Sequence, residues 1–195
     1  MKIRESGMPE RDAWDTYFDA ELILHELGLT SACHDVVEFG CGYGTFTIPA
    51  ARLVTGTVHA LDIDPSMIMV VRSRAEECGL ENIELTVRDF IAEGTGLPTG
   101  CMDYAMVFNI LHHEEPVGLL REAYRNLKGG GLIGIIHWIN DPDTPRGPPM
   151  SMRPSPEQCA QWAEEAGFSR CSQSIALPPY HYGLMLRRDD FSTPI

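Results

Sequence analysis

Histidine and tyrosine side chains stand at two places in this chain where an apolar run comes to an end. His112 and His113 follow one such run, and Tyr180 and His181 lie between the last two. An imidazole titrates near pH 6.5, so each of the three histidines can take a proton from a nucleophile at neutral pH. The sequence therefore predicts His113, His112, His181 and Tyr180 as catalytic candidates. His113 is the first choice, and one of the adjacent pair is expected to pack in place instead.

The spacing of the histidines and cysteines bears on metal binding and on disulfides. In "HHEE" (112–115) the two histidines are adjacent, whereas metal-binding histidines on one helix lie three or four residues apart. Neighbouring side chains seldom converge on one ion, so we expect no metal site. The six cysteines include no C-x-x-C pair, which argues against a disulfide framework or a zinc ribbon. Free thiols of this kind favour a reducing, cytoplasmic location.

The stretch "VVEFGCGYGT" (36–45) places three glycines within five positions, directly after a short apolar run. Gly40, Gly42 and Gly44 permit positive φ angles and leave no side chain between the backbone and a ligand. A helical pattern follows, and the N-terminus of a helix favours negative charge. The stretch therefore predicts a turn that holds a nucleotide-like ligand with an anionic group, although such turns also need glycine for purely steric reasons.

Two aspartates follow the next two predicted strands. Asp62 comes 18 residues after Gly44, and in a doubly wound sheet its carboxylate would lie beside the glycine turn, within reach of both ribose hydroxyls of a nucleotide. The alternative is that Asp62 caps the next helix, but Asp64 is better placed to do so. Asp89 follows the third strand, where it would accept a hydrogen bond from the amine of an adenine or else remain a solvated loop residue.

The elements that must position these residues are strands alternating with helices. This order predicts an α/β fold with a doubly wound, mostly parallel seven-stranded sheet and helices on both faces. The last two strands are separated by only four residues and must therefore form a C-terminal antiparallel hairpin. The predicted strands are 35–39, 57–62, 82–87, 102–110, 131–138, 169–177 and 182–188.

Start and stop signals mark the helices. Asp64 and Pro65 should begin one helix and Gly79 should end it, while the capping box "SPEQ" (155–158) begins another. The whole chain, 1–195, is expected to be one domain, with the N-terminal segment 1–30 as a helical lid. The remaining predicted helices are 44–54 and 116–127, and the Pro-rich stretch 139–155 is expected to be an active-site loop.

Composition limits the partners. The net charge of −13 argues against nucleic acid, because phosphates are held by clustered lysine and arginine. No apolar run reaches the roughly 18 residues of a membrane span, and the first ten residues lack a signal-peptide core. We expect a cytoplasmic protein that acts on a small molecule, and the sequence is compatible with a homodimer.

Taken in order, the motifs resemble those of the class I S-adenosylmethionine-dependent methyltransferases over about residues 35–188. "VVEFGCGYG" resembles the first motif of that family and "VHALDID" the second. "VRDF" resembles the adenine motif, "MDYAMVFNILHH" the fourth strand with its catalytic edge, and "LREAYRNLKGGGLIGIIHW" the following helix and strand. The resemblance implies S-adenosylmethionine as the methyl donor, S-adenosylhomocysteine as the product, and transfer to a small-molecule acceptor by in-line displacement.

The resemblance also implies which residues hold the cofactor. Glu38 takes the acidic position near the methionine part, Asp62 is the ribose ligand, and Asp89 with Phe90 lies at the adenine. Tyr17 is a candidate lid residue because aromatic faces attract the sulfonium cation, although it would serve equally as a core anchor. The full expected set is Glu38, Gly40, Cys41, Gly42, Gly44, Asp62, Ile63, Asp89, Phe90, Asn109 and Tyr17.

Two other functions remain open at this point. One is a module that binds S-adenosylmethionine without catalysis. The other is a nicotinamide-dependent oxidoreductase, but its G-x-G-x-x-G fingerprint would need glycine where Thr45 stands. The cysteines characteristic of arsenite methyltransferases do not map onto this chain. The pattern is also similar to quinone-ring C-methyltransferases, which carry longer substrate-binding additions.

Overall fold

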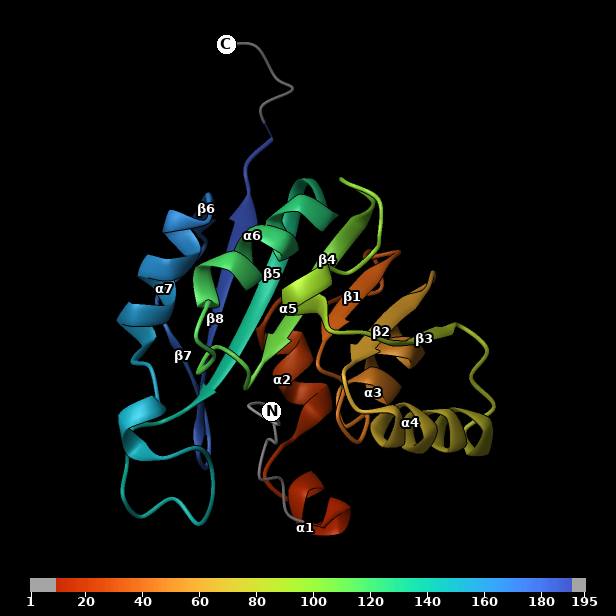
Figure 1. Ribbon diagram of the computed structural model, residues 1–195, viewed down its shortest axis with the longest axis horizontal. Helices are drawn as coiled ribbons and strands as arrows, with labels where there is room; N and C mark the ends of the chain where they lie inside the picture. The colour runs from red at the N-terminus through yellow and green to blue at the C-terminus, as the bar shows by residue number, and fades with distance from the viewer. Residues whose placement is uncertain (1–9, 191–195) are drawn as a thin grey trace.

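The computed structural model describes residues 10–190, and these form an α/β fold around one central sheet (Figure 1). The strand order is β3-β2-β1-β4-β5-β8-β6, with β7 also paired to β8. The first five strands are parallel, and β8 runs antiparallel to β5. The strands are β1 (Val36–Phe39), β2 (Val58–Asp62), β3 (Ile83–Val87), β4 (Met102–Phe108), β5 (Leu127–Trp138), β6 (Phe168–Arg170), β7 (Ile175–Leu177) and β8 (His181–Arg188).

This architecture confirms the predicted fold class, with one refinement at the C-terminal edge. The run predicted as a single strand, 169–177, is divided into β6 and β7, and both pair antiparallel with β8. β6 and β7 therefore both lie along β8, where the sequence predicted one continuous strand. Only the β7–β8 pair is the predicted hairpin.

Helices cover both faces of the sheet, as the alternation of strands and helices requires. One buried cluster joins the sheet to α2, α3 and α4, and a second joins it to α5, α6 and α7. Within α6, Leu119, Leu120 and Ala123 form the buried stripe. The helices are α1 (Arg11–Asp15), α2 (Ala20–Glu26), α3 (Thr47–Leu53), α4 (Pro65–Glu77), α5 (Phe90–Glu93), α6 (Pro116–Asn126), the 3-10 turn η1 (Met150–Met152) and α7 (Pro156–Glu165).

The predicted helix signals act as expected. Asp64 accepts from the amide of Ser66 at the start of α4, with Pro65 in the first turn. Gly79 follows the helix with φ +65°. Ser155 and Gln158 exchange hydrogen bonds in a complete capping box at the start of α7. These local rules place the ends of both helices correctly.

One predicted helix start and one predicted strand end are wrong, because a residue with a positive φ angle lies at each. The helix predicted from Gly44 begins only at Thr47, since Gly44 has φ +78° and a right-handed helix cannot include it. The strand predicted to reach Ile110 ends at Phe108, since Asn109 has φ +58°. Of the predicted N-terminal helical segment 1–30, residues 1–9 lie outside the described part of the chain, and the rest contains α1 and α2.

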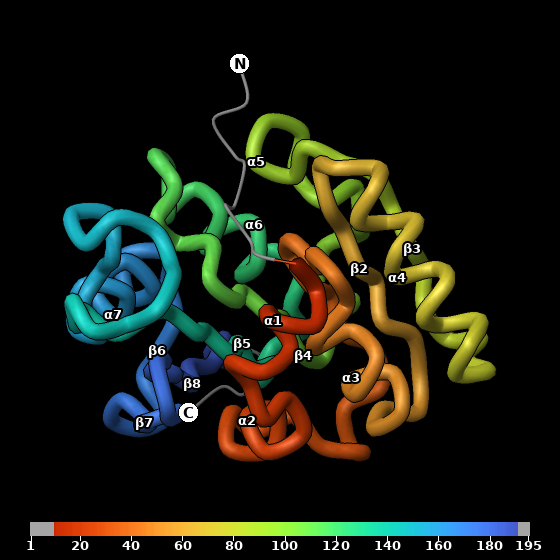
Figure 2. The backbone as a smooth tube through the Cα atoms, turned by 90° about the horizontal axis from the view of Figure 1, so that it is seen from below, coloured from red at the N-terminus to blue at the C-terminus, as the bar shows by residue number. Residues whose placement is uncertain are grey.

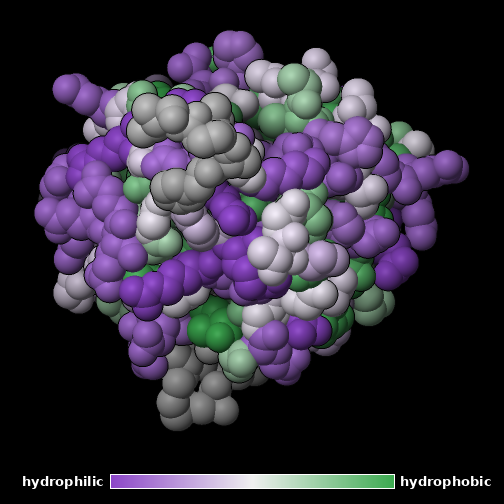
Figure 3. Space-filling model, turned by 90° about the horizontal axis from the view of Figure 1, so that it is seen from above, coloured by the Kyte–Doolittle hydropathy of each residue, from purple (hydrophilic) through white to green (hydrophobic). Residues whose placement is uncertain are grey.

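The order of the strands reverses between β1 and β4, so the carboxyl ends of these neighbours border the crevice where open α/β sheets bind ligands. Figure 2 looks at this edge, with α1 crossing the centre between the cyan 139–155 loop and the orange α3. The opposite edge is mostly hydrophilic, with apolar residues in small groups (Figure 3). None of the helices within residues 10–190 is both long enough and apolar enough to cross a bilayer.

Candidate functional site

Asp62 ties the second strand to the glycine turn. It ends β2 with 9% of its surface exposed, and its Oδ2 accepts from the amide of Gly42 at 2.9 Å. Its Oδ1 accepts from the amide of Asp64, also at 2.9 Å. Burial raises the pKa of Asp62, and these backbone donors counteract part of that rise. A carboxylate has about four lone-pair sites, so the group retains acceptor capacity toward a ligand.

Glu38 lies beneath the turn rather than at its surface. It is 3% exposed, and Thr47 donates a hydrogen bond of 2.5 Å to its Oε2. Burial raises the pKa of Glu38 to about 8, against the effect of the Thr47 bond, and the charge of Asp62 adds to the rise. The buried Cys41 thiol has its pKa raised by burial and by both carboxylates, so it remains protonated and is not a nucleophile.

The amides of the glycine turn are already engaged within the protein. Gly40 and Cys41 both donate to the carbonyl of Leu61, Gly42 donates to Asp62, and Gly44 donates to the carbonyl of Cys41. All four amides are thus hydrogen-bonded within the protein, and their contact with an anionic group stays a prediction. Moreover, α3 begins three residues after Gly44 and has only seven residues. The turn serves to bring backbone and carboxylate together, which sequence spacing alone did not reveal.

Gly40 lies among apolar side chains at the ends of β1 and β4, and we call this place the Gly40 slot. A methyl group at Gly40 would lie 3.3 Å from Cγ2 of Ile110 and 4.0 Å from Cζ of Phe90. Phe90 is held edge-on against Phe39, with ring centroids 5.4 Å apart. Ile63, after β2, is 42% exposed. Glycine at position 40, with φ +77°, thus lets the backbone lie directly against these apolar side chains, where a larger residue would crowd Ile110.

The remaining expected cofactor residues have other immediate roles. Gly44 packs on α4, because a methyl group there would lie 3.1 Å from Val71. Asp89 caps α5, where its Oδ1 accepts from the amides of Ile91 and Ala92. Asn109 differs from both, since its buried Oδ1 has no partner while its backbone amide bonds to Ile136. An unsatisfied acceptor beside the Gly40 slot is open to a donor from a ligand.

The histidines divide into separate groups. His137 is fully buried on the face that carries Tyr182, and its Nδ1 accepts from the amide of Trp138. Burial lowers the pKa of His137 to about 3, so the ring is neutral and its proton must be on Nε2. That nitrogen faces Nδ1 of His112 at 3.4 Å. The network therefore assigns the proton of neutral His112 to Nε2, which makes its outer edge a hydrogen-bond donor.

His113, the first choice from the sequence, has a local partner. Its Nδ1 accepts from the amide of Glu115 at 3.1 Å, in the turn before α6. The neighbouring residue, His112, has its pKa lowered by burial and by the charge of His113. Each of the two histidines thus has a ring nitrogen in contact with another group of the protein, and a catalytic role for either remains a prediction.

His181 is enclosed by aromatic rings. It is 2% exposed, and its ring centroid lies 4.3 Å from that of Trp138 and 4.5 Å from that of Phe18. Neither ring nitrogen has a hydrogen-bond partner. Burial lowers the pKa of His181 to about 3, with a smaller effect from the charge of Arg153. The ring is therefore neutral, with one donor and one acceptor both unused.

Tyr17 and Tyr180 belong to the same aromatic group. Tyr180 stacks with Trp138 at 6.3 Å between centroids, and Tyr17 meets both rings edge-on at 5.8 Å. Trp14 also contacts Trp138, at 6.2 Å. The N-terminal segment therefore lies over the ends of β5 and β8, and Tyr17 faces the catalytic candidates rather than the glycine turn.

A polar contact joins this segment to the turn. Oδ1 of Asp15 accepts from the hydroxyl of Thr45 at 2.5 Å, and Oδ2 lies 3.4 Å from Nη2 of Arg74. Arg74 also donates to the carbonyl of Tyr43 at 2.7 Å. We call the Asp15–Thr45–Arg74 group the α1 latch. No sequence signal pointed to it, since its members are 29 or more residues apart.

The 139–155 loop is organised by one side chain that the sequence did not single out. Arg153 is 9% exposed and donates to five acceptors in the loop. Its guanidinium also lies 5.6 Å from the ring of Trp138. The acceptors are the carbonyls of Pro148, Ile139, Asp141 and Arg146 and the hydroxyl of Thr144. The loop is thereby held against the aromatic group.

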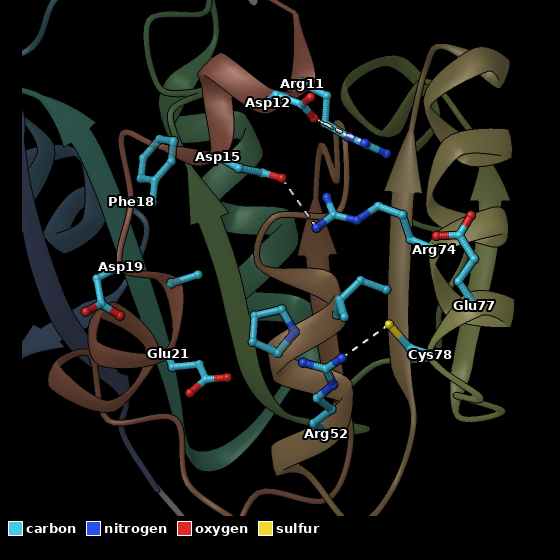
Figure 4. Close-up of a pocket in the computed structure, with 13 residues that line it drawn as sticks. Arg11, Asp12, Asp15, Phe18, Asp19, Glu21, Arg52, Arg74, Glu77 and Cys78 are labelled. Atoms are coloured by element: carbon cyan, nitrogen blue, oxygen red, sulfur yellow. Dashed lines mark hydrogen bonds and ion pairs between the residues drawn. The ribbon is translucent and has the colours of Figure 1, made fainter.

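A cavity of about 680 Å³ lies on the other side of the N-terminal segment, between it and α3 and α4 (Figure 4). Its charged lining mixes carboxylates with arginines, and Asp15 and Arg74 lie on its wall. It contains neither the Gly40 slot nor the histidines, so its size does not make it the reaction site. Within residues 10–190, no group of three or more His, Cys, Asp or Glu side chains is arranged to hold a metal ion.

Comparison with known proteins gives a consistent result. A family described as a methyltransferase domain matches residues 36–131. Aklanonic acid methyltransferase DauC from Streptomyces sp. (strain C5) is 35% identical over 143 residues, which are 67% of this chain and 63% of that protein. Demethylmenaquinone methyltransferase from Listeria welshimeri is 30% identical over 52% of this chain and 44% of its own length. The chain thus spans less than two thirds of these relatives.

Solved structures share the fold. A SAM-dependent methyltransferase from Aquifex aeolicus superposes with a TM-score of 0.79 at 24% identity, covering 88% of this chain and 90% of that one. The [4+2]-cyclase SpnF superposes with a TM-score of 0.75 at 17% identity, covering 96% and 85%. At such identities the similarity establishes the architecture alone.

Proposed function

The chain belongs to the class I S-adenosylmethionine-dependent methyltransferases, and from this premise we propose that it transfers a methyl group from S-adenosylmethionine to a small-molecule acceptor. The observation that supports this best is the Asp62–Gly42 contact beside the apolar surroundings of Gly40. A carboxylate with acceptor capacity next to a flat apolar space suits a ribose joined to an adenine.

The residues present fit this cofactor. Asp62 would hold the ribose hydroxyls, and Gly40, Phe90 and Ile110 would border the adenine. The unpartnered Oδ1 of Asn109 would accept from an ammonium group. Glu38 would act from below, by fixing the start of α3 through Thr47. Because four amides of the glycine turn already donate hydrogen bonds within the protein, other donors would bind the carboxylate of the cofactor.

When bound, S-adenosylmethionine supplies a methyl group that its cationic sulfur already activates. The chain contributes positioning, since in-line transfer depends on alignment of the acceptor. The rings of Trp138, Tyr17 and Tyr180 exclude water from that space. Neutral His181 offers an unused acceptor nitrogen that would hydrogen-bond and orient a hydroxyl nucleophile, and His112 offers a donor from Nε2.

A small acceptor in the cytoplasm fits the remaining observations. The net charge of −13 disfavours nucleic acid, and all six cysteines are free thiols, as in a reducing compartment. The candidate site is lined by rings that contact one another closely, so the acceptor is confined beneath α1 rather than spread over an exposed surface.

Calorimetry with S-adenosylmethionine, S-adenosylhomocysteine and NAD tests the proposal. We expect both sulfur compounds to bind and NAD not to bind. Radiolabelled methyl transfer to a panel of hydroxylated aromatic and aliphatic acceptors then tests catalysis. Binding of NAD alone would overturn the cofactor assignment.

A second candidate is a module that binds the cofactor without methyl transfer. It is kept because the [4+2]-cyclase SpnF has the same architecture, so the fold by itself does not establish the reaction. Tight binding of S-adenosylmethionine with no transfer to any acceptor in the panel would favour this candidate.

A further inference from the structure

An unpartnered imidazole is the feature that the cofactor site does not explain. His181 is 2% exposed and both of its ring nitrogens lack hydrogen-bond partners. Buried polar groups are nearly always hydrogen-bonded, because a buried donor or acceptor without a partner destabilises the fold. A ligand that supplies these partners is a direct physical reason for the side chain to be there.

The walls around His181 are flat. Trp138 is its register partner on β5, so both side chains stand on the same face of the sheet. Phe18 covers the imidazole from the N-terminal segment, and Phe46 supports Phe18 with ring centroids 5.2 Å apart. Aromatic walls of this kind favour stacked or edge-on contact with another aromatic ring. Phe18 currently occupies the position that such a ring would take.

α1 is held by ring contacts of Trp14 with Trp138 and Phe18 and by the polar α1 latch. None of the residues of α1 is buried, whereas α2 is anchored by the buried Ile23 and Leu24. The polar attachment of α1 to the rest of the fold is the α1 latch through Asp15, drawn in Figure 4 as the Asp15–Arg74 line. The cavity of about 680 Å³ beside it leaves room for movement. Segments with few buried contacts open at low free-energy cost.

We propose that α1, together with Phe18 after it, is a displaceable cover over the acceptor site, and that the acceptor is a planar aromatic molecule that takes the place of Phe18 beside His181 and pairs its hydroxyl group with a ring nitrogen of His181. This rests on the proposed function, because it names the acceptor class of the same site. Opening requires release of the α1 latch, so the glycine turn and the acceptor site are mechanically connected through Asp15 and Thr45.

Calorimetry on the protein saturated with S-adenosylhomocysteine tests this with three matched probes. 2-Naphthol has the planar ring and the hydroxyl, naphthalene lacks the hydroxyl, and decahydro-2-naphthol lacks the planar ring. We expect 2-naphthol to bind at least tenfold more tightly than either of the others. Equal affinities for 2-naphthol and decahydro-2-naphthol would overturn the proposal.

Variants separate the two parts of the proposal. His181→Phe keeps a ring but removes both nitrogens, so 2-naphthol should bind about tenfold more weakly while naphthalene is unaffected. Asp15→Asn weakens the α1 latch without touching the aromatic site, so 2-naphthol should bind several-fold more tightly. Asp12→Asn is the control, because Asp12 is exposed on α1 and pairs with its neighbour Arg11. If 2-naphthol binds the Asp15→Asn and Asp12→Asn variants with equal affinity, the proposal that α1 is a displaceable cover is overturned.

The outcome also distinguishes this proposal from the previous one. If S-adenosylhomocysteine binds but 2-naphthol does not, the acceptor class is wrong and the proposed methyl transfer stands. If S-adenosylhomocysteine itself does not bind, the proposed function fails first. Should His181→Phe fail to fold, as judged by loss of S-adenosylhomocysteine binding, the Asp15→Asn comparison still decides.

Discussion

The amide of Gly42 donates a hydrogen bond of 2.9 Å to Oδ2 of Asp62, 20 residues further along the chain. This contact joins the ends of β1 and β2 into one rigid corner. It orients the carboxylate and closes the glycine turn at the same time. A change at either residue should therefore affect both the turn and any ligand held there.

Asp62→Ala should weaken binding of S-adenosylhomocysteine at least tenfold, about 1.4 kcal/mol, because it leaves ribose hydroxyls unpaired and frees the turn. Calorimetry measures this directly. Asp64→Ala is the matched control, since it removes the α4 cap and about 1 kcal/mol of stability without changing the corner. Equal affinities for Asp62→Ala and wild type would show that the ribose assignment is wrong.

Gly40→Ala should lower cofactor affinity at least fivefold. Both Gly40 (φ +77°) and Gly79 (φ +65°) have left-handed backbones, so alanine costs about 1 kcal/mol of stability at either position. A methyl group at position 40 would meet Ile110 and Phe90, whereas at position 79 nothing lies within 4 Å. Comparing melting temperature and affinity in the two variants separates strain from obstruction. If Gly79→Ala weakens binding equally, the adenine slot is misplaced.

Stability should fall as the pH drops below about 6.5. His181 has its pKa lowered to about 3 by burial, so the folded protein keeps it neutral while the unfolded chain takes up a proton near pH 6.5. The unfolded state therefore binds more protons between these values, and stability decreases by about 1.4 kcal/mol per pH unit for this group. Urea unfolding between pH 4.5 and 6.5 should show a smaller pH slope for His181→Phe than for wild type. Parallel slopes would contradict the neutral, buried assignment.

Glu38 should act in the opposite direction. Burial raises its pKa to about 8 in the folded protein, against an unfolded value near 4.5. Its contribution is complete below the unfolded value and is lost as the pH rises from there to about 8. Glu38→Gln should therefore gain stability relative to wild type over this window, at about 1.4 kcal/mol per pH unit. A stability difference that stays constant from pH 5 to pH 8 would show that Glu38 is ionised throughout.

Arg153→Met should loosen the 139–155 loop, because five hydrogen bonds from its guanidinium are lost. Amide hydrogen exchange within residues 139–149 should accelerate at least tenfold, while β5 stays protected. Arg146→Ala is the control, since Arg146 contributes a backbone carbonyl that alanine retains. Unchanged exchange in Arg153→Met would show that the prolines alone order the loop.

Much of this protein follows from rules that act between near neighbours in the sequence. Strand periodicity, the Asp64 cap and the Ser155 capping box predicted the elements. The order of motifs predicted the family. These features depend on backbone angles and hydrogen bonds within a few residues, which the local sequence controls.

The tertiary structure alone decided which side chains meet. It gave the amides of Gly40 and Gly42 to protein acceptors, placed His181 beside Phe18, and joined Asp15 to Thr45. Partners separated by 20 to 163 residues are set by strand order and register, and no residue carries that information in its own type or spacing. The sequence could therefore predict that a site lies at this edge of the sheet, but not which groups there are already satisfied and which are left for a ligand.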